Sequence, residues 1–127
     1  MTKILDFNAE LRKISAETEK TIRRDDFPQK ILPPFLKNSA LDYPLRKGKR
    51  LRPALLRWTC GLFGGKNENA KFAAAAVEIF HNWTLVHYDI IDNDATRNGE
   101  PSTHCVLANF AKSKGFSDED AKTFGLA

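Results

Sequence analysis

The segment from Lys71 to Asp94, "KFAAAAVEIFHNWTLVHYDIIDND", contains neither glycine nor proline. Its apolar residues recur at the three- and four-residue spacing of a helix, so it predicts one uninterrupted helix that begins between Asn67 and Lys71. A helix of roughly 20 residues spans about 30 Å, the diameter of a small domain. The rest of the fold must therefore be built along this helix.

Shorter helices are predicted on the N-terminal side of this segment. Apolar residues at near-helical spacing between Asp6 and Arg24 indicate a surface helix with one buried stripe. A second helix follows in "LRKGKRLRPALLRWTCGLFGG", where Pro53 suits the first turn and Gly64–Gly65 ends it. Both helices can pack their apolar stripes on a neighbouring helix.

The remaining segments predict connections and two short helices. Residues 25–44 contain four prolines, which predicts a connection with short helical turns. The stretch "RNGEPSTH", residues 97–104, predicts a turn. Beyond it we expect one helix closed by Gly115 and another capped by Ser117 or Asp118. No segment alternates in the manner of a strand, so the predicted fold class is all-α.

The composition narrows the class of protein. Of the 127 residues, 42% are hydrophobic and 28% are charged, which is typical of a folded domain and argues against disorder. No apolar run reaches the ~20 residues that span a bilayer, and "MTKILDFNAE" lacks the order of a signal peptide. Cys60 and Cys105 fit neither a disulfide framework nor a metal-binding spacing. We therefore expect a cytoplasmic protein with reduced thiols and no membrane span.

Positive charge is concentrated between Arg46 and Arg57, in a chain of net charge +4. The stretch lacks the interleaved aromatic residues of a single-strand platform, so we expect no nucleic-acid partner. Lys49 and Arg52 stand at a predicted helix start, where free backbone N–H groups already favour an anion. This pattern predicts an anion cradle, and a solvated basic turn is the alternative.

Acidic residues gather at the end of the long helix. His81, Tyr88 and Asp92 fall on one face of that helix, with Asp89 beside them. Carboxylates a turn apart suit magnesium, which is typically held by one or two carboxylates plus substrate phosphates. A calcium-binding EF-hand loop starting at Asp92 is excluded because its sixth position is Arg97, where glycine is required. A solvated acidic cluster or a helix cap remains the alternative.

A cationic cradle and a carboxylate pair are together the parts needed to hold two diphosphates. The motifs "GKRLRP", "EIFHNWTLVHYDIIDND" and "TRNGEPSTH", in this order and spacing, closely resemble those of the trans-type polyprenyl diphosphate synthases. The likeness covers the chain from about Gly48 onward. It implies the N-terminal helices of an isoprenoid-synthase-type antiparallel bundle around a deep apolar cavity. We therefore interpret residues 1–127 as an incomplete, N-terminal portion of one synthase domain, with its motifs in residues 46–104.

The resemblance implies roles for individual residues in substrate binding. Lys49, Arg52 and His81 are expected to bind isopentenyl diphosphate, and Arg97 is expected to contact the allylic diphosphate. A histidine on an apolar helix is also often a satisfied core residue, which is the alternative for His81.

The resemblance also implies a metal site. The family's first aspartate-rich motif, Asp-Asp-x-x-Asp, falls on residues 88–92, so Asp89 and Asp92 are expected to bind Mg²⁺. With Arg97 they are the expected catalytic residues. The resemblance places Trp83 just before this motif, where a bulky side chain forms the floor of the product cavity and favours a short product. Packing in the protein core is the alternative for Trp83.

The chain departs from the family pattern at several positions. Tyr88 replaces the first aspartate of the motif, and a neutral phenol with a pKa of about 10 does not substitute for a carboxylate at neutral pH. Asn98 stands where a second arginine is usual, and Lys47 replaces a usual glycine. Family members are also much longer and carry a second aspartate-rich motif.

We therefore expect a trans-prenyltransferase of isoprenoid biosynthesis that condenses isopentenyl diphosphate with an allylic diphosphate. As a truncated chain it is expected to turn over little substrate alone, to expose apolar faces and to form a homo- or hetero-oligomer. A non-catalytic partner subunit of a prenyl synthase and a plain helical interaction module are the alternatives.

Overall fold

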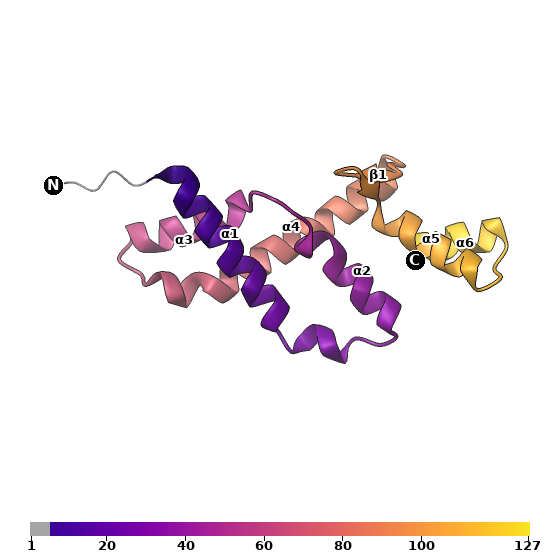
Figure 1. Cartoon of the computed structure of the whole chain (residues 1–127), viewed down its shortest axis with the longest axis horizontal. Coiled ribbons are helices and arrows are strands. Elements are labelled where there is room, and N and C mark those ends of the chain that lie inside the picture. Colours follow the sequence, from indigo (N-terminus) through magenta and orange to yellow (C-terminus); the bar gives the residue numbers. More distant parts are fainter. Residues whose placement is uncertain (1–5) are drawn as a thin grey trace. The chain divides into compact units, whose positions relative to one another are not determined.

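The computed structural model describes residues 6–127, which are largely helical (Figure 1). The earlier expectation about a signal peptide falls partly on residues 1–5, which lie outside the described residues. The elements, in chain order, are α1 (Phe7–Arg24), η1 (Phe27–Lys30), α2 (Pro34–Leu45), α3 (Leu51–Leu62), η2 (Asn67–Ala70), α4 (Lys71–Ile91), β1 (Thr96–Arg97), β2 (Glu100–Pro101), α5 (Thr103–Ser113) and α6 (Asp118–Leu126). The predicted all-α class is confirmed. No helix within residues 6–127 has the length and apolar character to traverse a bilayer.

The long helix predicted from the sequence is α4, which begins at Lys71 and ends at Ile91, before the predicted end at Asp94. The start of α1 is explained by a side-chain cap. Asp6 caps α1 because its carboxylate accepts hydrogen bonds from the backbone N–H groups of Asn8 and Ala9, at 2.9 and 3.2 Å. These groups would otherwise lack partners in the first turn.

Residues 25–44 were predicted to be a connection with short helical turns, and η1 is one such turn. The prediction was wrong for the second part of this segment, because the helix α2 occupies Pro34–Leu45. Pro34 is its first residue, where the fixed backbone angle of proline suits a helix and no N–H is needed. Pro44 lies in its last turn, so it interrupts little of the helix. Pro34 and Pro44 interrupt the helix less than expected because they stand at its two ends.

The predicted turn at residues 97–104 overlaps a small antiparallel hairpin of residues 96–101 that the sequence did not indicate. Thr96 pairs with Pro101, and Arg97 pairs with Glu100. The two residues between the strands are Asn98 and Gly99, both with positive φ, at 55° and 81°. Asn-Gly is the preferred pair for a two-residue hairpin loop. Arg97 therefore lies at the end of β1, directly before the two-residue loop of this hairpin.

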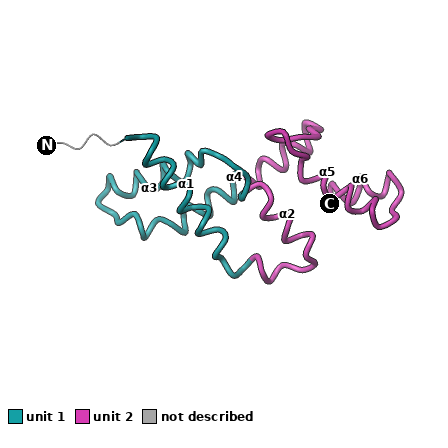
Figure 2. The backbone as a smooth tube through the Cα atoms, viewed as in Figure 1, with its two compact units in different colours: residues 1–27, 44–81 teal, residues 28–43, 82–127 magenta. Residues whose placement is uncertain are grey.

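The chain divides into two compact units, drawn in teal and magenta in Figure 2. Unit 1 comprises residues 6–27 and 44–81 of the described chain, and unit 2 comprises residues 28–43 and 82–127. The helix α4 contributes its first half to unit 1 and its second half to unit 2.

In unit 1, α1 packs on α3 through a small apolar core. The ring of Phe7 lies 5.3 Å from the ring of Trp58, at the N-terminal end of this contact. Next to the apolar core, the almost fully buried Arg57 of α3 donates a hydrogen bond to Glu17 of α1 at 2.6 Å. The residues of the core are Leu11, Ile14 and Ala54, with Trp58 packed against them.

In unit 2, α5 and α6 lie side by side and form a helical hairpin (Figure 1). Aromatic rings join this hairpin to α2, since the ring of Phe35 lies 5.0 Å from that of Phe110 and 5.4 Å from that of Phe124. A close helix approach accompanies these contacts, because Gly125 of α6 presents no side chain to α5. Aromatic packing thus joins α2, α5 and α6, and Gly125 allows the close approach of α6 to α5.

The burial pattern of α4 is inverted relative to that of an ordinary surface helix. Its buried positions include Ala74, Ala75 and Asp89. Its large apolar side chains are exposed instead, as expected for a chain with uncovered apolar faces. These exposed residues are Phe72, Ile79, Phe80, Trp83 and Ile91.

Gly125→Ala is expected to lower the free energy of unfolding by about 1–3 kcal/mol. A Cβ at this position would overlap the carbonyl oxygen of His104 and lie 3.1 Å from the Cβ of Ala108. Urea unfolding followed by circular dichroism measures the change. Gly61→Ala is the control, because a Cβ there meets no atom within 4 Å and alanine favours the helix. Equal unfolding midpoints for the two variants would contradict the expected clash.

Candidate functional site

In unit 1 the structure brings together two of the residues predicted to bind isopentenyl diphosphate. Arg52 lies in the first turn of α3, and its Nη1 is 3.0 Å from Nε2 of His81 on α4. A guanidinium only donates hydrogen bonds, so Nε2 of His81 accepts and the ring proton resides on Nδ1. The histidine thereby orients the planar donor group of Arg52 beside the N-terminus of α3.

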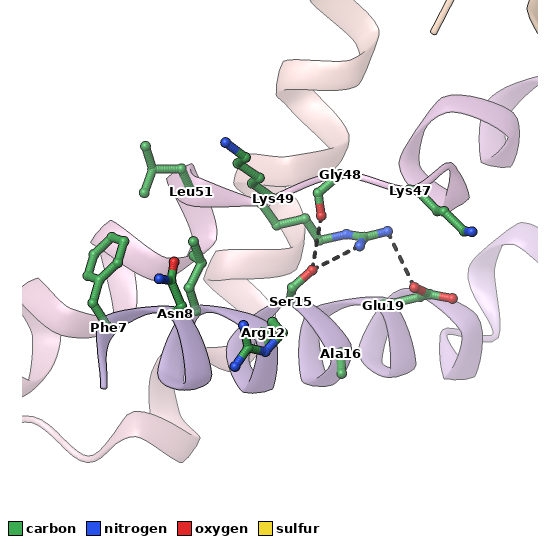
Figure 3. A pocket seen from close by; sticks show the side chains of 12 residues that line it. Phe7, Asn8, Arg12, Ser15, Ala16, Glu19, Lys47, Gly48, Lys49 and Leu51 are labelled. Atoms are coloured by element: carbon green, nitrogen blue, oxygen red, sulfur yellow. Dashed lines mark hydrogen bonds and ion pairs between the residues drawn. The ribbon is translucent and has the colours of Figure 1, made fainter. Parts of the chain in front are cut away.

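Lys49 lies three residues before Arg52, in the exposed loop that leads into α3. It lines a groove of about 630 Å³ between α1 and this loop, together with Lys47, Arg12 and Ser15 (Figure 3). In Figure 3 the amine of Lys49 extends away from α1. The loop therefore presents this cation to solvent on its side opposite α1.

In unit 2 the carboxylate of Asp89 is completely buried and makes several charge-assisted hydrogen bonds. Nε of Arg97 donates to both carboxylate oxygens, at 2.9 and 2.8 Å, and Nη2 of Arg97 donates to Oδ1. The hydroxyl of Tyr43 donates to Oδ2 at 2.5 Å. That hydroxyl in turn accepts a hydrogen bond from the backbone N–H of Thr103 at 3.2 Å. Asp89 of α4 thus contacts the β1–β2 hairpin through Arg97. Through Tyr43 it is also linked to α2 and to the backbone of α5.

These contacts determine the charge of the cluster. Burial acts to raise the pKa of Asp89, but the hydrogen bonds from Arg97 and Tyr43 outweigh it, so this pKa lies below its ordinary value. The hydrogen bond to Asp89 likewise raises the pKa of Arg97. Burial and the neighbouring carboxylate raise the pKa of Tyr43. The cluster is therefore an ionised pair with a neutral phenol.

The other predicted metal ligand, Asp92, is placed differently. It lies just beyond the end of α4, and its backbone N–H donates to the carbonyl oxygen of Tyr88 at 2.8 Å. The side chains of Tyr88 and Asp92 are both exposed. These two positions are one helical turn apart, but only Asp92 offers a carboxylate.

The residues do not fit a two-carboxylate magnesium clasp in this arrangement. Both oxygens of Asp89 already accept hydrogen bonds from Arg97, so coordination would require that ion pair to open. Within residues 6–127, no group of three or more His, Cys, Asp or Glu side chains is placed to hold a metal ion. This arrangement does not favour joint binding of a metal ion by Asp89 and Asp92, which stays a prediction.

Trp83, the predicted floor of the product cavity, is exposed on α4. Its ring lies 4.3 Å from the ring of His87, one turn further on, and Nδ1 of His87 is 2.9 Å from the carbonyl oxygen of Trp83. The side chain of Trp83 therefore lies on the exposed face of α4. Its role in product length stays a prediction.

Sequence reasoning missed two residues of these clusters, Tyr43 and Arg50. Tyr43 stands 46 positions before Asp89, in a segment predicted to be a connection, so no local signal links the two. Arg50 lies in the basic stretch between Arg46 and Arg57, where no separate role was predicted for it, and its side chain is only 3% exposed. Only the tertiary structure identifies either partner.

Asp89→Asn is expected to lower the free energy of unfolding at neutral pH by about 2 kcal/mol, because Arg97 loses its charged acceptor. Asp89 has a lowered pKa in the folded state, so its stabilisation is complete above its unfolded pKa of about 3.9. It is lost as the pH falls through the lower folded pKa. The difference between wild type and variant should therefore disappear in acid, as urea unfolding at a series of pH values measures.

Asp118→Asn is the matched control for this prediction. Its pKa is also lowered, by the hydrogen bond from Lys112, but its side chain is 89% exposed. Exposed pairs contribute little to stability, so this variant should unfold like wild type. A pH-independent difference for Asp89→Asn would contradict the assigned charge state.

Comparison with known proteins gives relatives of one kind. The chain is 60% identical to a geranylgeranyl diphosphate synthase of Saccharolobus solfataricus over 57 residues, which cover 45% of this chain and 17% of that protein. It is 34% identical to a short chain isoprenyl diphosphate synthase of Methanothermobacter thermautotrophicus over 106 residues, which cover 84% of this chain and 31% of that protein. No solved structure gives a significant match.

A third relative is the large subunit 1 of a heterodimeric geranylgeranyl pyrophosphate synthase of Arabidopsis thaliana, a chloroplastic protein, 42% identical over 77 residues. These residues cover 58% of this chain and 21% of that protein. The matched segments thus span between 17% and 31% of the lengths of these three relatives. The model of the polyprenyl synthetase family matches residues 34–116, from the start of α2 to just beyond α5. Because this match covers more than half of the chain and contains all the predicted site residues, the chain belongs to the polyprenyl synthetase family.

Proposed function

We propose that this chain carries the isopentenyl diphosphate site of a trans-type prenyltransferase of isoprenoid biosynthesis. In the proposed reaction the allylic C–O bond breaks, and the diphosphate leaves with the bonding electrons. The double bond of isopentenyl diphosphate then attacks the carbocation, and a proton is lost. The chain's own part is to bind isopentenyl diphosphate and to orient its double bond.

The contact between Arg52 and His81 carries this proposal. These residues come from different helices, 29 positions apart, yet their side chains meet at 3.0 Å. Lys49 supplies a second exposed cation three residues before Arg52. A forked guanidinium, an ammonium group and a helix N-terminus are suited to a diphosphate, because each stabilises negative charge on phosphate oxygens.

We further propose that the complete enzyme uses Mg²⁺ and that Asp92 is the carboxylate of this chain open to the ion. Asp89 accepts hydrogen bonds from Arg97 and Tyr43, so its role is to stabilise the β1–β2 hairpin against α4. Substrate phosphates are the usual further ligands of magnesium. We also propose that the active form is an oligomer, because the large apolar residues of α4 are exposed.

A second candidate function is that of a non-catalytic partner subunit. The observation that favours it is the loss of one carboxylate at Tyr88 together with the engagement of Asp89 by Arg97. A similar protein of Arabidopsis thaliana is the large subunit of a heterodimeric synthase. In this case the chain keeps the anion site and another chain supplies the chemistry.

Lys49→Ala and Arg52→Ala are each expected to weaken the binding of isopentenyl diphosphate by about tenfold, because each removes a charge-assisted contact. Isothermal titration calorimetry of the purified chain measures the dissociation constants. Lys20→Ala is the matched control, since it removes one exposed cation from α1 and should leave the affinity unchanged. Absence of binding by the wild-type chain would overturn the proposal and leave the helical interaction module as the better description.

Tyr88→Asp is expected to create a magnesium site, because residues 88 and 92 stand one turn apart at the end of α4. Mg²⁺ should bind roughly tenfold more tightly than to wild type, as titration calorimetry measures. Tyr88→Asn is the control, since it also replaces the ring but adds no charge. Equal Mg²⁺ affinities of the two variants would contradict the expectation that carboxylates at positions 88 and 92 together bind the ion.

A further inference from the structure

We propose that Arg50 is a positioning residue that fixes the loop before α3, so that Lys49 and Arg52 present their cations to one diphosphate. The inference rests on the proposed function of that loop as an anion site. Arg50 itself cannot touch the ligand, because its side chain is 3% exposed. Its effect must therefore pass through the residues beside it.

The backbone of Arg50 points to a special requirement at this position. Its φ and ψ are both 48°, in the left-handed region that non-glycine residues adopt rarely. It occupies the N-cap of α3, where Ser, Thr, Asp or Asn usually accept hydrogen bonds, and its side chain makes no such cap. Glycine would adopt this conformation without a Cβ penalty. The arginine is therefore best explained by what its side chain holds.

That side chain ties the loop to the preceding segment and to α1. Nη2 of Arg50 donates to the carbonyl oxygens of Pro44 and Arg46, at 3.0 and 3.2 Å. Nη1 donates to Oγ of Ser15 on α1 at 3.1 Å. The hydroxyl of Ser15 donates in turn to the carbonyl oxygen of Gly48 at 3.2 Å. The loop from Arg46 to Arg50 is thus bound to Pro44 in the last turn of α2 and to Ser15 of α1.

The charge of Arg50 is compensated within unit 1. Glu19 of α1 lies 3.6 Å from Nη2, and Glu78 of α4 lies 3.9 Å from Nε. A buried guanidinium without such partners would be strongly unfavourable. Its neighbours Lys49 and Arg52 are exposed instead. Arg50 therefore adds little positive potential to the anion site and acts through geometry.

We call the hydrogen bonds of Arg50 and Ser15 to the loop and to α1 the clamp. The clamp lies on one side of the loop only. Figure 3 shows interactions that link Ser15 to Gly48 and reach Glu19 on the α1 side, while the amine of Lys49 extends to the other side. Since Arg50 lies between Lys49 and Arg52, its backbone angles set the relative directions of the two cations. A fixed loop meets the diphosphate already ordered, which avoids a conformational cost on binding.

The experiment compares Arg50→Asn with Arg57→Gln in the full chain. Asparagine tolerates the left-handed conformation but removes the guanidinium. Arg57 is an equally buried arginine of α3, 4% exposed and bonded to Glu17, and it is not part of the loop. Calorimetry with isopentenyl diphosphate should give at least about tenfold weaker binding for Arg50→Asn and wild-type affinity for Arg57→Gln. Wild-type affinity of Arg50→Asn, or an equal loss in Arg57→Gln, would overturn the proposal.

A milder variant covers the case in which Arg50→Asn does not fold. Ser15→Ala removes the hydroxyl that links Gly48 and Arg50 to α1, and it should weaken binding by roughly threefold. Wild-type affinity of a folded Ser15→Ala would then count against the clamp. Circular dichroism confirms that each titrated variant is folded.

Hydrogen exchange separates failure of this inference from failure of the proposed function. Amides of residues 47–51 should exchange faster in Arg50→Asn than in wild type, and Arg57→Gln should leave them unchanged. Faster exchange with no diphosphate binding by wild type would overturn the proposed function and the ligand part of this inference. Unchanged exchange in Arg50→Asn would overturn the positioning role even if wild type binds isopentenyl diphosphate.

Discussion

The pairing of buried charges organises both units of this chain. Arg57 and Arg50 in unit 1 and Asp89 in unit 2 are almost completely removed from water, and each contacts a partner of opposite charge. Removal of an ionised group from water is strongly unfavourable unless it is paired and hydrogen bonded. Each pair therefore restricts which segments can lie together, and in unit 1 the paired residues are distant in the sequence.

The helical part of the fold was predictable because it depends on local periodicity. The long apolar repeat of α4 and the stripe of α1 that contains Leu11 and Ile14 needed no tertiary information. The helix α2 was missed because its prolines suggested interruption, although a proline at the first helical position favours a helix. The hairpin at Asn98 was missed because strands of two residues carry no alternation.

The sequence proposed residues for the candidate site but did not indicate the contacts between them. The motifs selected Arg52 and His81, which the structure places in contact. They also selected Asp89 and Arg97 for separate ligands, a metal ion and a diphosphate, whereas the structure joins the two in an ion pair. A motif records which residue types occur at which spacing. It does not record which of two nearby charges neutralises the other, because that depends on burial.

The inverted burial of α4 follows from the same constraint. The inner face of this helix carries alanines and the polar Glu78, Asn82 and Asp89, since close packing and charge pairing require small or polar groups there. The large apolar side chains are left on the other face, and burying each would contribute roughly 1.5–3 kcal/mol. Such a face lowers its free energy when another apolar surface covers it. The helix α4 thus combines charged and polar groups on its packed face with bulky apolar residues on its exposed face.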